Sequence, residues 1–151
     1  MSNVQLQEEI DRELWWPIQR AYSARDMESL LRLYSPDVIR AGGPNSEILD
    51  FDDFAAAGAA WFAQLTDNDT ELQIDFRFTE RILDKNSASE RGIFKLNLTK
   101  PDGQSEIAYG RFHVFLRRVE RWMIVVDYDS HDREAVSSHD FSAAQPVSAV
   151  M

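Results

Sequence analysis

The stretch from Glu106 to Ser130 constrains the fold of this chain more than any other part of the sequence. Apolar and polar side chains alternate along it in two runs, and alternation with a period of two is typical of β-strands. A tight charged turn, which holds Arg117, Arg118 and Arg121, separates the two runs. The stretch therefore predicts two long strands joined as an antiparallel hairpin.

Two further strands are predicted immediately before this hairpin. The segment from Glu71 to Leu83 places apolar residues at alternate positions, and so does the segment from Ala88 to Thr99. A turn at residues 84–87 separates these two segments, and residues 101–103, Pro-Asp-Gly, are a strong hairpin signal before the third strand. The second half of the chain thus predicts four long antiparallel strands.

The first half of the chain has helical periodicity instead. Within residues 4–24, apolar side chains recur every four positions from Ile10 to Tyr22, which predicts an amphipathic helix with one buried face. Pro17 lies inside this pattern and lacks a backbone N–H, so we expect a kink or a helix start near it.

A second, short helix is predicted from Met27 to Tyr34. Asp26 precedes it and is a good N-cap, because its carboxylate can accept hydrogen bonds from the free N–H groups of the first helical turn. A short strand at residues 38–41 and a turn at residues 42–45 follow.

A third helix, capped by Asp50 or Asp52, is predicted to run to about Leu65. Residues 137–151 are rich in Ser and Ala without periodicity, and we expect them to be poorly ordered. Helices followed by antiparallel strands predict an α+β domain. In it, three N-terminal helices pack on a strongly curved antiparallel sheet and leave a cone-shaped cavity, in which a ligand would bind.

The composition excludes several classes of function. The chain has 151 residues, enough for one domain with its own core, and a net charge of -10 that repels nucleic acids. It has no cysteine, which excludes disulfides, thiolate catalysis and cysteine-based metal sites. The N-terminus lacks the pattern of a signal peptide, and no apolar run reaches the roughly 18 residues of a membrane span. We therefore expect a cytoplasmic protein that has no cofactor and binds neither nucleic acid nor membrane.

Two stretches of the chain carry recognisable motifs. Residues 24–37, ARDMESLLRLYSPD, have the pattern D-x-x-x-L-x-x-x-Y-x-x-D on a predicted helix. Residues 121–130, RWMIVVDYDS, have the pattern W-x-I-x-x-D on the last predicted strand. Both patterns resemble those of the nuclear transport factor 2-like superfamily, which includes ketosteroid isomerases and SnoaL-like polyketide cyclases. The resemblance implies a cystatin-like domain, which we assign to residues 1–136, followed by a disordered tail at 137–151. Because the superfamily hosts enzymes, binders and oligomerisation modules, the resemblance does not specify the function.

The catalytic residues of ketosteroid isomerases are not carried over to this chain. The tyrosine that this family has on its first helix falls at Ile18, and the aspartate that acts as its general base falls near Gly42. The protonated aspartate of the family falls near Arg111 or Phe112. The resemblance therefore does not imply steroid isomerisation by that mechanism.

Two other families of the superfamily match the chain in part. The Asp-Arg-Asp trio of limonene epoxide hydrolase places its arginine at Arg91 and one aspartate at Asp127, but its other aspartate falls at Ile93. SnoaL-like cyclases often use a histidine and an aspartate in the cavity, which His113 and Asp127 could supply. Both comparisons single out Asp127.

Strand parity determines where these side chains point. Strict alternation puts Arg111 and His113 on the mixed face of one strand, and Asp127 and Asp129 on the mixed face of the next. If the apolar faces pack on the helices, these residues lie on the outside of the sheet, which in this superfamily is commonly the dimer interface. If the mixed faces point inward, the same residues line the pocket. A bulge partway along a strand would switch the parity.

Asp127 is the best candidate for catalysis, because burial beside aromatic side chains raises the pKa of a carboxyl group as a general base requires. His113 could form a carboxylate-supported base with Asp127, or it could be a hydrogen-bonded histidine at an interface or surface. Arg91 could orient an anion or epoxide oxygen, or pair with a carboxylate across the sheet. The run at residues 127–132 lacks the glycine and glutamate of a calcium loop, so we predict no metal site. The side chains predicted to line the pocket are Trp15, Tyr34, Trp61, Phe62, Phe76, Phe78, Arg111 and Trp122.

Two hypotheses of function follow. In the first, a homodimer binds a small apolar or aromatic molecule in the cavity and acts on it by acid–base chemistry of isomerase, cyclase or hydrolase type. In the second, the chain is a non-catalytic dimerisation or ligand-sensing module, and the mixed face of the sheet is its interface.

Overall fold

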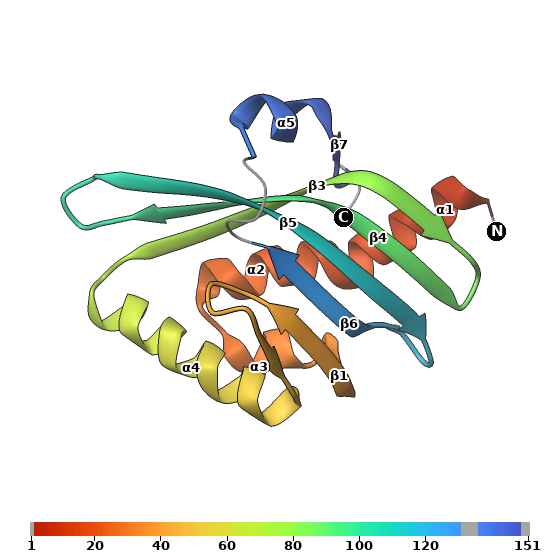
Figure 1. The fold of residues 1–151 in the computed structure, drawn as a ribbon, viewed down its shortest axis with the longest axis horizontal. Coiled ribbons are helices and arrows are strands. Elements are labelled where there is room, and N and C mark those ends of the chain that lie inside the picture. Colours follow the sequence, from red (N-terminus) through yellow and green to blue (C-terminus); the bar gives the residue numbers. More distant parts are fainter. Residues whose placement is uncertain (1, 131–135, 149–151) are drawn as a thin grey trace.

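The computed structural model of the chain describes residues 2–130 and 136–148. The predicted helices and strands are present in the predicted order (Figure 1), and short elements at residues 47–49, 138–143 and 145–146 are additional. The helical elements are α1 (Asn3–Ile10), the π-helical turn η1 (Asp11–Trp15), α2 (Trp16–Ala24), α3 (Met27–Leu31), α4 (Phe51–Asp67) and α5 (Ser138–Ala143). The strands are β1 (Tyr34–Gly42), β2 (Glu47–Leu49), β3 (Glu71–Leu83), β4 (Ser87–Thr99), β5 (Ser105–Arg118), β6 (Trp122–Ser130) and β7 (Gln145–Pro146).

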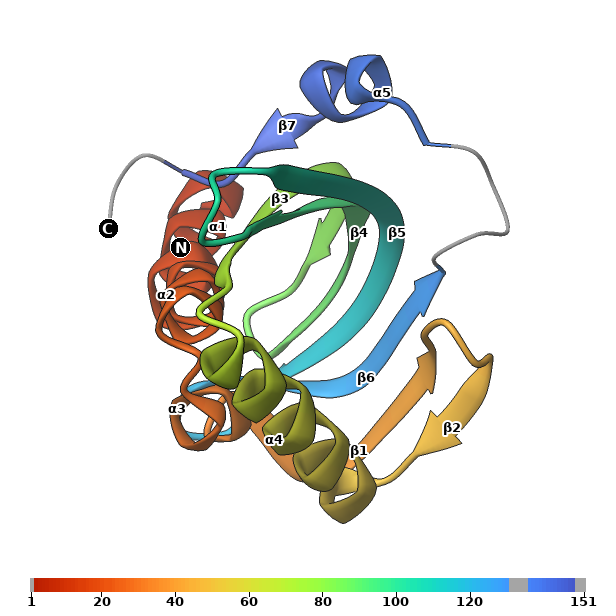
Figure 2. The same cartoon turned by 90° about the vertical axis from the view of Figure 1, so that its left-hand side faces the viewer.

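One sheet holds all of these strands, in the order β2-β1-β6-β5-β4-β3-β7. Neighbouring strands are antiparallel except β1 and β6, which run parallel. Figure 2 shows that the sheet curves strongly, with α1 and α2 along one side of the curve and α4 across its open end. The predicted α+β architecture, with N-terminal helices packed on a curved sheet, is confirmed.

The N-terminal helix is interrupted where the proline predicts a change. Pro17 lies in the first turn of α2, and the five residues of η1 precede it. In η1 the backbone N–H of Trp16 bonds to the carbonyl of Asp11, a spacing of five residues in place of four. Because Pro17 cannot donate a backbone hydrogen bond, the wider turn lets the helix continue past it.

The predicted caps are present, but the second helix is shorter than expected. Asp26 accepts a hydrogen bond from the backbone N–H of Ser29 at 3.1 Å, and Asp50 caps α4 in the same way. The second helix ends at Leu31, and Tyr34 already belongs to β1. Tyr34 pairs with Ile124 of β6, so contact with a strand distant in the sequence overrides the helical pattern there.

A β-bulge in β6 settles the question of strand parity. Phe115 of β5 pairs with Val126, whereas the next residue of β5 pairs with Ile124, so Val125 is an extra residue without a partner. Before the bulge, Trp122 and Ile124 face the core. After it, Asp127 takes over the inward position. The strict alternation assumed from the sequence is therefore wrong for β6, and the bulge alternative is correct.

The C-terminal segment differs from the expected poorly ordered tail. Ser137 and Asp140 form a capping box at the start of α5, and β7 pairs with β3 through Arg77 and Phe78. Phe141 is buried on the outer face of the sheet, where its ring centroid lies 5.8 Å from that of Tyr109. One aromatic side chain and a local cap therefore order a segment that has no periodicity of its own.

No helix in residues 2–130 and 136–148 is both long and apolar enough to cross a membrane.

Gly42, at the end of β1, provides a test of this fold. Its φ is 103°, and a Cβ atom there would lie 1.8 Å from the backbone carbonyl oxygen of Asp129. We expect Gly42→Ala to lower the free energy of unfolding by more than the about 1–3 kcal/mol of a strained backbone, because the clash adds to the strain. Urea denaturation measures the difference.

Gly103→Ala is the matched control. Gly103 also has a positive φ, of 89°, but no atom lies within 4 Å of the added Cβ. Equal losses of stability in the two variants would contradict the close approach of β1 and β6.

Candidate functional site

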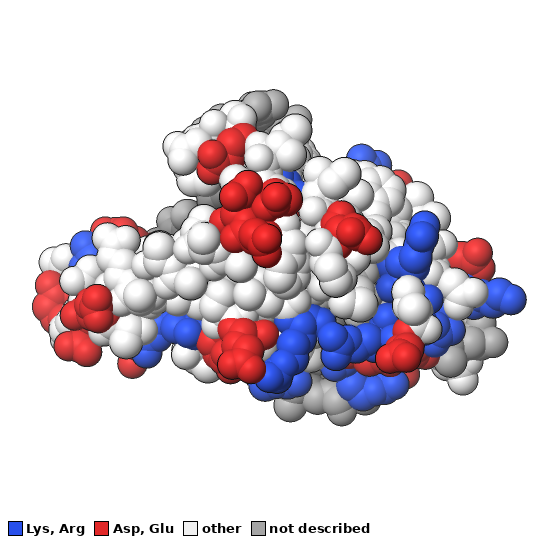
Figure 3. Space-filling view, turned by 90° about the horizontal axis from the view of Figure 1, so that it is seen from below, with Lys and Arg blue, Asp and Glu red and all other residues white. Residues whose placement is uncertain are grey.

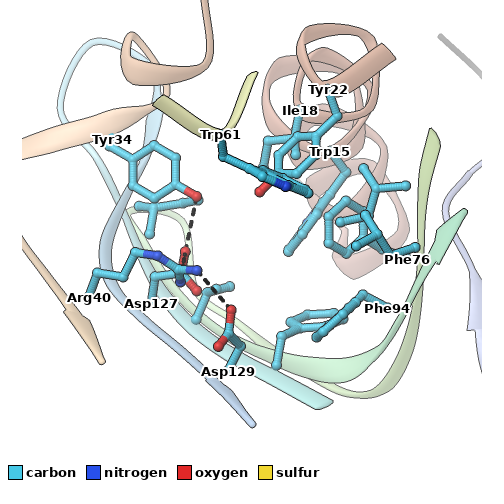
Figure 4. A pocket seen from close by; sticks show the side chains of 15 residues that line it. Trp15, Ile18, Tyr22, Tyr34, Arg40, Trp61, Phe76, Phe94, Asp127 and Asp129 are labelled. Carbon is cyan, nitrogen blue, oxygen red and sulfur yellow. Dashed lines mark hydrogen bonds and ion pairs between the residues drawn. The ribbon is translucent and has the colours of Figure 1, made fainter. Parts of the chain in front are cut away.

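A cavity of about 120 Å³ lies on the concave side of the sheet (Figure 4). Most of its wall is apolar and aromatic, with contributions from η1, α2, α4 and five strands. Its lining residues are Trp15, Ile18, Tyr22, Tyr34, Arg40, Trp61, Ile74, Phe76, Phe94, Leu96, Phe112, Val114, Ile124, Asp127 and Asp129. An apolar enclosure with a few converging polar groups is the usual form of a small-molecule site.

The polar groups of the cavity are concentrated where β1 meets β6. Arg40 on β1 pairs in register with Asp127 on β6, and its Nη1 lies 3.3 Å from Oδ2 of this aspartate. The Nη2 of Arg40 lies 2.9 Å from Oδ2 of Asp129. The hydroxyl group of Tyr34 donates a hydrogen bond to Oδ2 of Asp127 at 3.0 Å. Two adjacent strands thus assemble an arginine, two carboxylates and a phenol.

Backbone geometry fixes the second carboxylate. The N–H of Gly43 donates to Oδ1 of Asp129 at 2.7 Å. The turn that brings this N–H into place requires positive φ at both Gly42 and Gly43, which favours glycine. Asp129 is therefore held as a hydrogen-bond acceptor by both Arg40 and the main chain.

Asp127 has a different environment from Asp129. Burial raises the pKa of its carboxyl group, and this effect outweighs the neighbouring guanidinium of Arg40, which lowers the pKa. The charge of Asp129 raises the pKa further, while the hydrogen bond from Tyr34 lowers it. A carboxyl group with a raised pKa can exchange a proton closer to neutral pH.

The remaining ionisable groups of the site respond to the same charges. Burial by itself lowers the pKa of Arg40, but Asp127 and Asp129 raise it above its ordinary value, so the guanidinium stays charged. Burial raises the pKa of Tyr22 to about 12, and that of Tyr34 also lies well above its ordinary value. Both phenols are therefore hydrogen-bond donors at neutral pH.

The two oxygens of Asp127 are not equivalent. Both of its contacts, to Tyr34 and to Arg40, involve Oδ2. Oδ1 has no hydrogen-bond partner among the described residues. It is also not among the fully buried polar atoms that lack a partner, so part of its surface remains accessible. The side chain as a whole is 11 % exposed. Oδ1 is thus the oxygen that can contact a molecule in the cavity.

A second, wider hollow of about 410 Å³ adjoins the cavity and shares with it the lining residues Tyr22, Arg40, Trp61 and Leu96. It lies between α4 and the β1–β2 hairpin and includes the small residues Ala57 and Gly58. A ligand larger than the inner cavity could extend into this outer chamber, whose size lies within the range of ligand pockets.

Two of the three predicted catalytic side chains lie outside the cavity. Arg91 and His113 are cross-strand neighbours on the outer face, where Arg91 pairs with Glu80 at 3.1 Å. The Nε2 of His113 lies 2.8 Å from the hydroxyl of Ser89, and partial burial and Arg91 lower its pKa. The predicted pairing of His113 with Asp127 is therefore wrong, because β5 has no bulge there and β6 does.

The predicted pocket residues fall into four groups. Trp15, Tyr34, Trp61 and Phe76 line the inner cavity, as does Asp127, which was predicted as a catalytic residue. Phe62 lines the outer chamber, while Arg111 lies on the outer face of the sheet. Phe78 and Trp122 are buried core residues that line neither cavity.

Sequence reasoning missed Arg40 as a site residue. The resemblance to limonene epoxide hydrolase placed the arginine of an Asp-Arg-Asp trio at Arg91, whereas the arginine that contacts Asp127 comes from β1. The second aspartate is Asp129, two residues further along the same strand. The parallel pairing of β1 with β6 leaves no local signal in the sequence that identifies Arg40.

A second buried ionic cluster supports one wall of the cavity. Arg81 contacts Asp11 at 2.8 Å and also pairs with Glu90, while the indole N–H of Trp15 donates to Glu90 at 2.8 Å. The Asp11 and Glu90 side chains are 1 % and 0 % exposed. Asp11, Arg81 and Glu90 line neither the inner cavity nor the outer chamber, and the hydrogen bond to Glu90 holds Trp15 in the cavity wall.

Basic side chains gather on part of the surface although the net charge is negative. Figure 3 shows them mainly in the right-hand half of the face seen from below. In the β5–β6 hairpin, Arg118 pairs with Glu9, and Arg121 donates to the carbonyl of Arg32. Arg32 in turn pairs with Glu28 at 2.8 Å. These arginines therefore make contacts within the protein.

The described residues contain no group of three or more His, Cys, Asp or Glu side chains placed to hold a metal ion. His131 and Asp132, at the end of the run considered for calcium, lie outside these residues.

Several solved structures are similar to this chain, although no protein-family model and no curated protein sequence matches it. A putative aromatic ring hydroxylase from Novosphingobium aromaticivorans has a TM-score of 0.69 at 14% identity, covering 94% of this chain and 99% of its own. An NTF2-like protein with a cystatin-like fold from the same species has a TM-score of 0.66 at 15% identity, covering 92% and 90%.

A putative calcium/calmodulin-dependent protein kinase II association domain from Xanthomonas campestris has a TM-score of 0.65 at 19% identity, covering 82% of this chain and 86% of its own. At these identities the similarity establishes the architecture and leaves the function undetermined. The chain has the nuclear transport factor 2-like fold, as the sequence resemblance predicted.

Proposed function

We propose that this chain binds a small apolar or aromatic molecule in the inner cavity and acts on it by acid–base chemistry, with Asp127 as the group that transfers the proton. One observation carries the proposal. Oδ2 of Asp127 is held by Tyr34 and Arg40, while Oδ1 is free to contact a ligand inside an aromatic enclosure. A positioned carboxyl group with a raised pKa meets both requirements of a general base.

The proposal assigns different tasks to the two carboxylates. Asp129 accepts hydrogen bonds from the Gly43 N–H and from Arg40, so it anchors the guanidinium. Asp127 has a raised pKa and an available oxygen. Neighbouring carboxylates whose environments differ in this way are the usual basis of an acid–base site.

The reaction is one that a single carboxyl group can carry out without an added reagent. In an isomerisation or cyclisation, Asp127 takes a proton from one position of the substrate and returns it to another, so that atoms and charge balance. In a hydrolysis, Asp127 takes the proton of a water molecule and the leaving oxygen receives it. The hydrogen bond from the Tyr34 hydroxyl to Oδ2 holds the carboxyl group in position while Oδ1 exchanges the proton.

A screen against small lipophilic ketones, phenols and epoxides tests the binding step. A ligand present at about 100 times its Kd should raise the free energy of unfolding by about 2.7 kcal/mol, which a thermal-shift measurement detects. For a compound that is turned over, Asp127→Asn should reduce kcat by about 10²–10⁴-fold, because it removes the proton acceptor.

Asp37→Asn is the control for this substitution. Asp37 lies on the same strand as Arg40, but its side chain is exposed. The Asp37→Asn variant should therefore bind ligand and turn it over as the wild type does. Equal activity of the wild type and a folded Asp127→Asn variant would refute the catalytic role of Asp127.

The raised pKa of Asp127 also predicts a pH dependence of stability. Between the ordinary pKa of aspartate, about 3.9, and the raised value in the folded state, the folded protein binds more protons than the unfolded chain. The contribution of Asp127 to stability therefore falls as the pH rises through this window. As the pH rises through this window, the unfolding free energy of the wild type should therefore fall relative to that of Asp127→Asn.

Chemical denaturation at a series of pH values measures this difference. Burial also raises the pKa of Glu90, but Glu90 is present in both proteins, so the difference isolates Asp127. A difference that is independent of pH above 4 would contradict the raised pKa.

The second candidate function is dimerisation through the outer face of the sheet, which a specific pattern of residues supports. A cross-strand row joins five neighbouring strands in register, at Ile39, Val126, Phe115, Ser89 and Ile82. Its three large members Ile39, Phe115 and Ile82 are 53 %, 42 % and 58 % exposed. We name this set the outer apolar row. Segment α5–β7 covers another part of the same face but not this row.

Phe115→Glu tests this candidate. If the outer apolar row joins two copies of the chain, a buried charge at its centre should shift the protein from dimer to monomer, as measured by sedimentation equilibrium. Val119→Glu is the control, because Val119 is 75 % exposed in the β5–β6 turn, away from the row. A wild-type protein that is monomeric at high concentration would exclude this interface.

A further inference from the structure

The inner cavity has an unequal distribution of charge. Two carboxylates and one guanidinium are among its lining groups. Arg40 is shared between these carboxylates, and its contact with Asp129, at 2.9 Å, is shorter than its contact with Asp127, at 3.3 Å. Both contacts use the guanidinium nitrogens, and its carbon lies 5.0 Å from the centre of the Phe54 ring. Arg40 is therefore held between two carboxylates, and an anion that approached it would also lie close to both negative charges.

The carboxylate of Asp127 has the opposite property. Asp127 as a whole is 8 % exposed. Its Oδ1 has no hydrogen-bond partner among the described residues. An ionised carboxylate buried to this extent is stabilised by any group that donates a hydrogen bond, and most strongly by a cationic donor.

The opposite wall of the cavity consists of aromatic rings. Figure 4 shows Trp15, Tyr22, Phe76 and Phe94 across the cavity from Arg40 and Asp127, with Trp61 between the two sides. Trp15 packs against Phe76 with ring centroids 4.8 Å apart. Rings of this kind pack against an apolar ring and attract organic cations through their faces, whereas they cannot replace the water around an anion.

From these features we propose that the cavity selects its ligand by charge, and that it takes a small ring compound bearing a protonated amine. The ammonium group donates a hydrogen bond to Oδ1 of Asp127, and the ring packs against the aromatic wall. A carboxylate of the same size is excluded, since it would face two carboxylates and an engaged arginine. This inference rests on the proposed function, because it names the ligand class of the same site.

Three single-ring probes that differ only in charge test the inference on the wild-type protein. They are benzylamine, benzyl alcohol and benzoate, and their small size suits an inner cavity of about 120 Å³. By isothermal titration at pH 7.5, benzylamine should bind at least about tenfold more tightly than benzyl alcohol, because a hydrogen bond to a charged group adds about this much. Benzoate should bind most weakly. Benzylamine affinity should also increase as the pH rises through the range where Asp127 loses its proton.

Two variants locate the effect. Asp127→Asn should remove the advantage of benzylamine over benzyl alcohol, whereas Asp37→Asn should preserve it. Thermal unfolding verifies that each variant is folded. If Asp127→Asn does not fold, the order of the three probes on the wild type decides the question by itself.

The outcomes separate this inference from the proposed function. Benzyl alcohol or benzoate binding as tightly as benzylamine overturns the charge selectivity, while turnover of a neutral compound from the screen would still support the proposed function. An amine preference that persists in folded Asp127→Asn overturns the assignment to Asp127. If none of the three probes binds, the inference is overturned. The screen of neutral compounds then tests the proposed function independently.

Discussion

A guanidinium buried between two carboxylates must keep both contacts, because the loss of one partner leaves a charge in a region where water cannot compensate it. Arg40 is in this position: its side chain is 19 % exposed, and those of Asp127 and Asp129 are 11 % and 12 % exposed. Strands β1 and β6 are held in one register by these ion pairs as well as by their parallel ladder. The position of β1 in turn determines where Tyr34 meets Asp127 and where the glycine turn meets Asp129.

The bulge at Val125 is the second condition for this arrangement. Without the extra residue, the side chains of Asp127 and Asp129 would continue on the face of Met123 and point away from the helices. With it, one strand contributes apolar residues to the core in its first half and carboxylates to the cavity in its second half. The neighbouring strand β5 has no compensating switch, so His113 stays outside. A single inserted residue thus separates the two side chains that the sequence suggested as a pair.

The parts of the fold that depend on local chemistry could be predicted from the sequence. Asp26 and Asp50 cap helices because the carboxylate and the N–H groups that it accepts from lie within three residues of each other. The four long strands follow from alternation. The position of Asp127 in the cavity could be predicted only as one alternative, because Met123 to Val126 are all apolar and conceal the parity change. Arg40 could not be predicted, since its partners lie 87 and 89 residues away and only the parallel pairing brings them together.

The two buried ionic clusters show why burial by itself does not identify a functional site. Asp11, Arg81 and Glu90 contain the same chemical groups as Asp127, Arg40 and Asp129, and burial raises the pKa of a carboxyl group in each. In the first cluster the side chains are at most 3 % exposed. The indole N–H of Trp15 donates a hydrogen bond to Oε1 of Glu90, so this oxygen also has a partner. Such a cluster can only support its surroundings. In the second cluster Asp127 lines an aromatic cavity, and its Oδ1 has no hydrogen-bond partner among the described residues. A carboxylate acts on a ligand only where the protein leaves one of its oxygens accessible, and this accessibility distinguishes the candidate site from the structural cluster beside it.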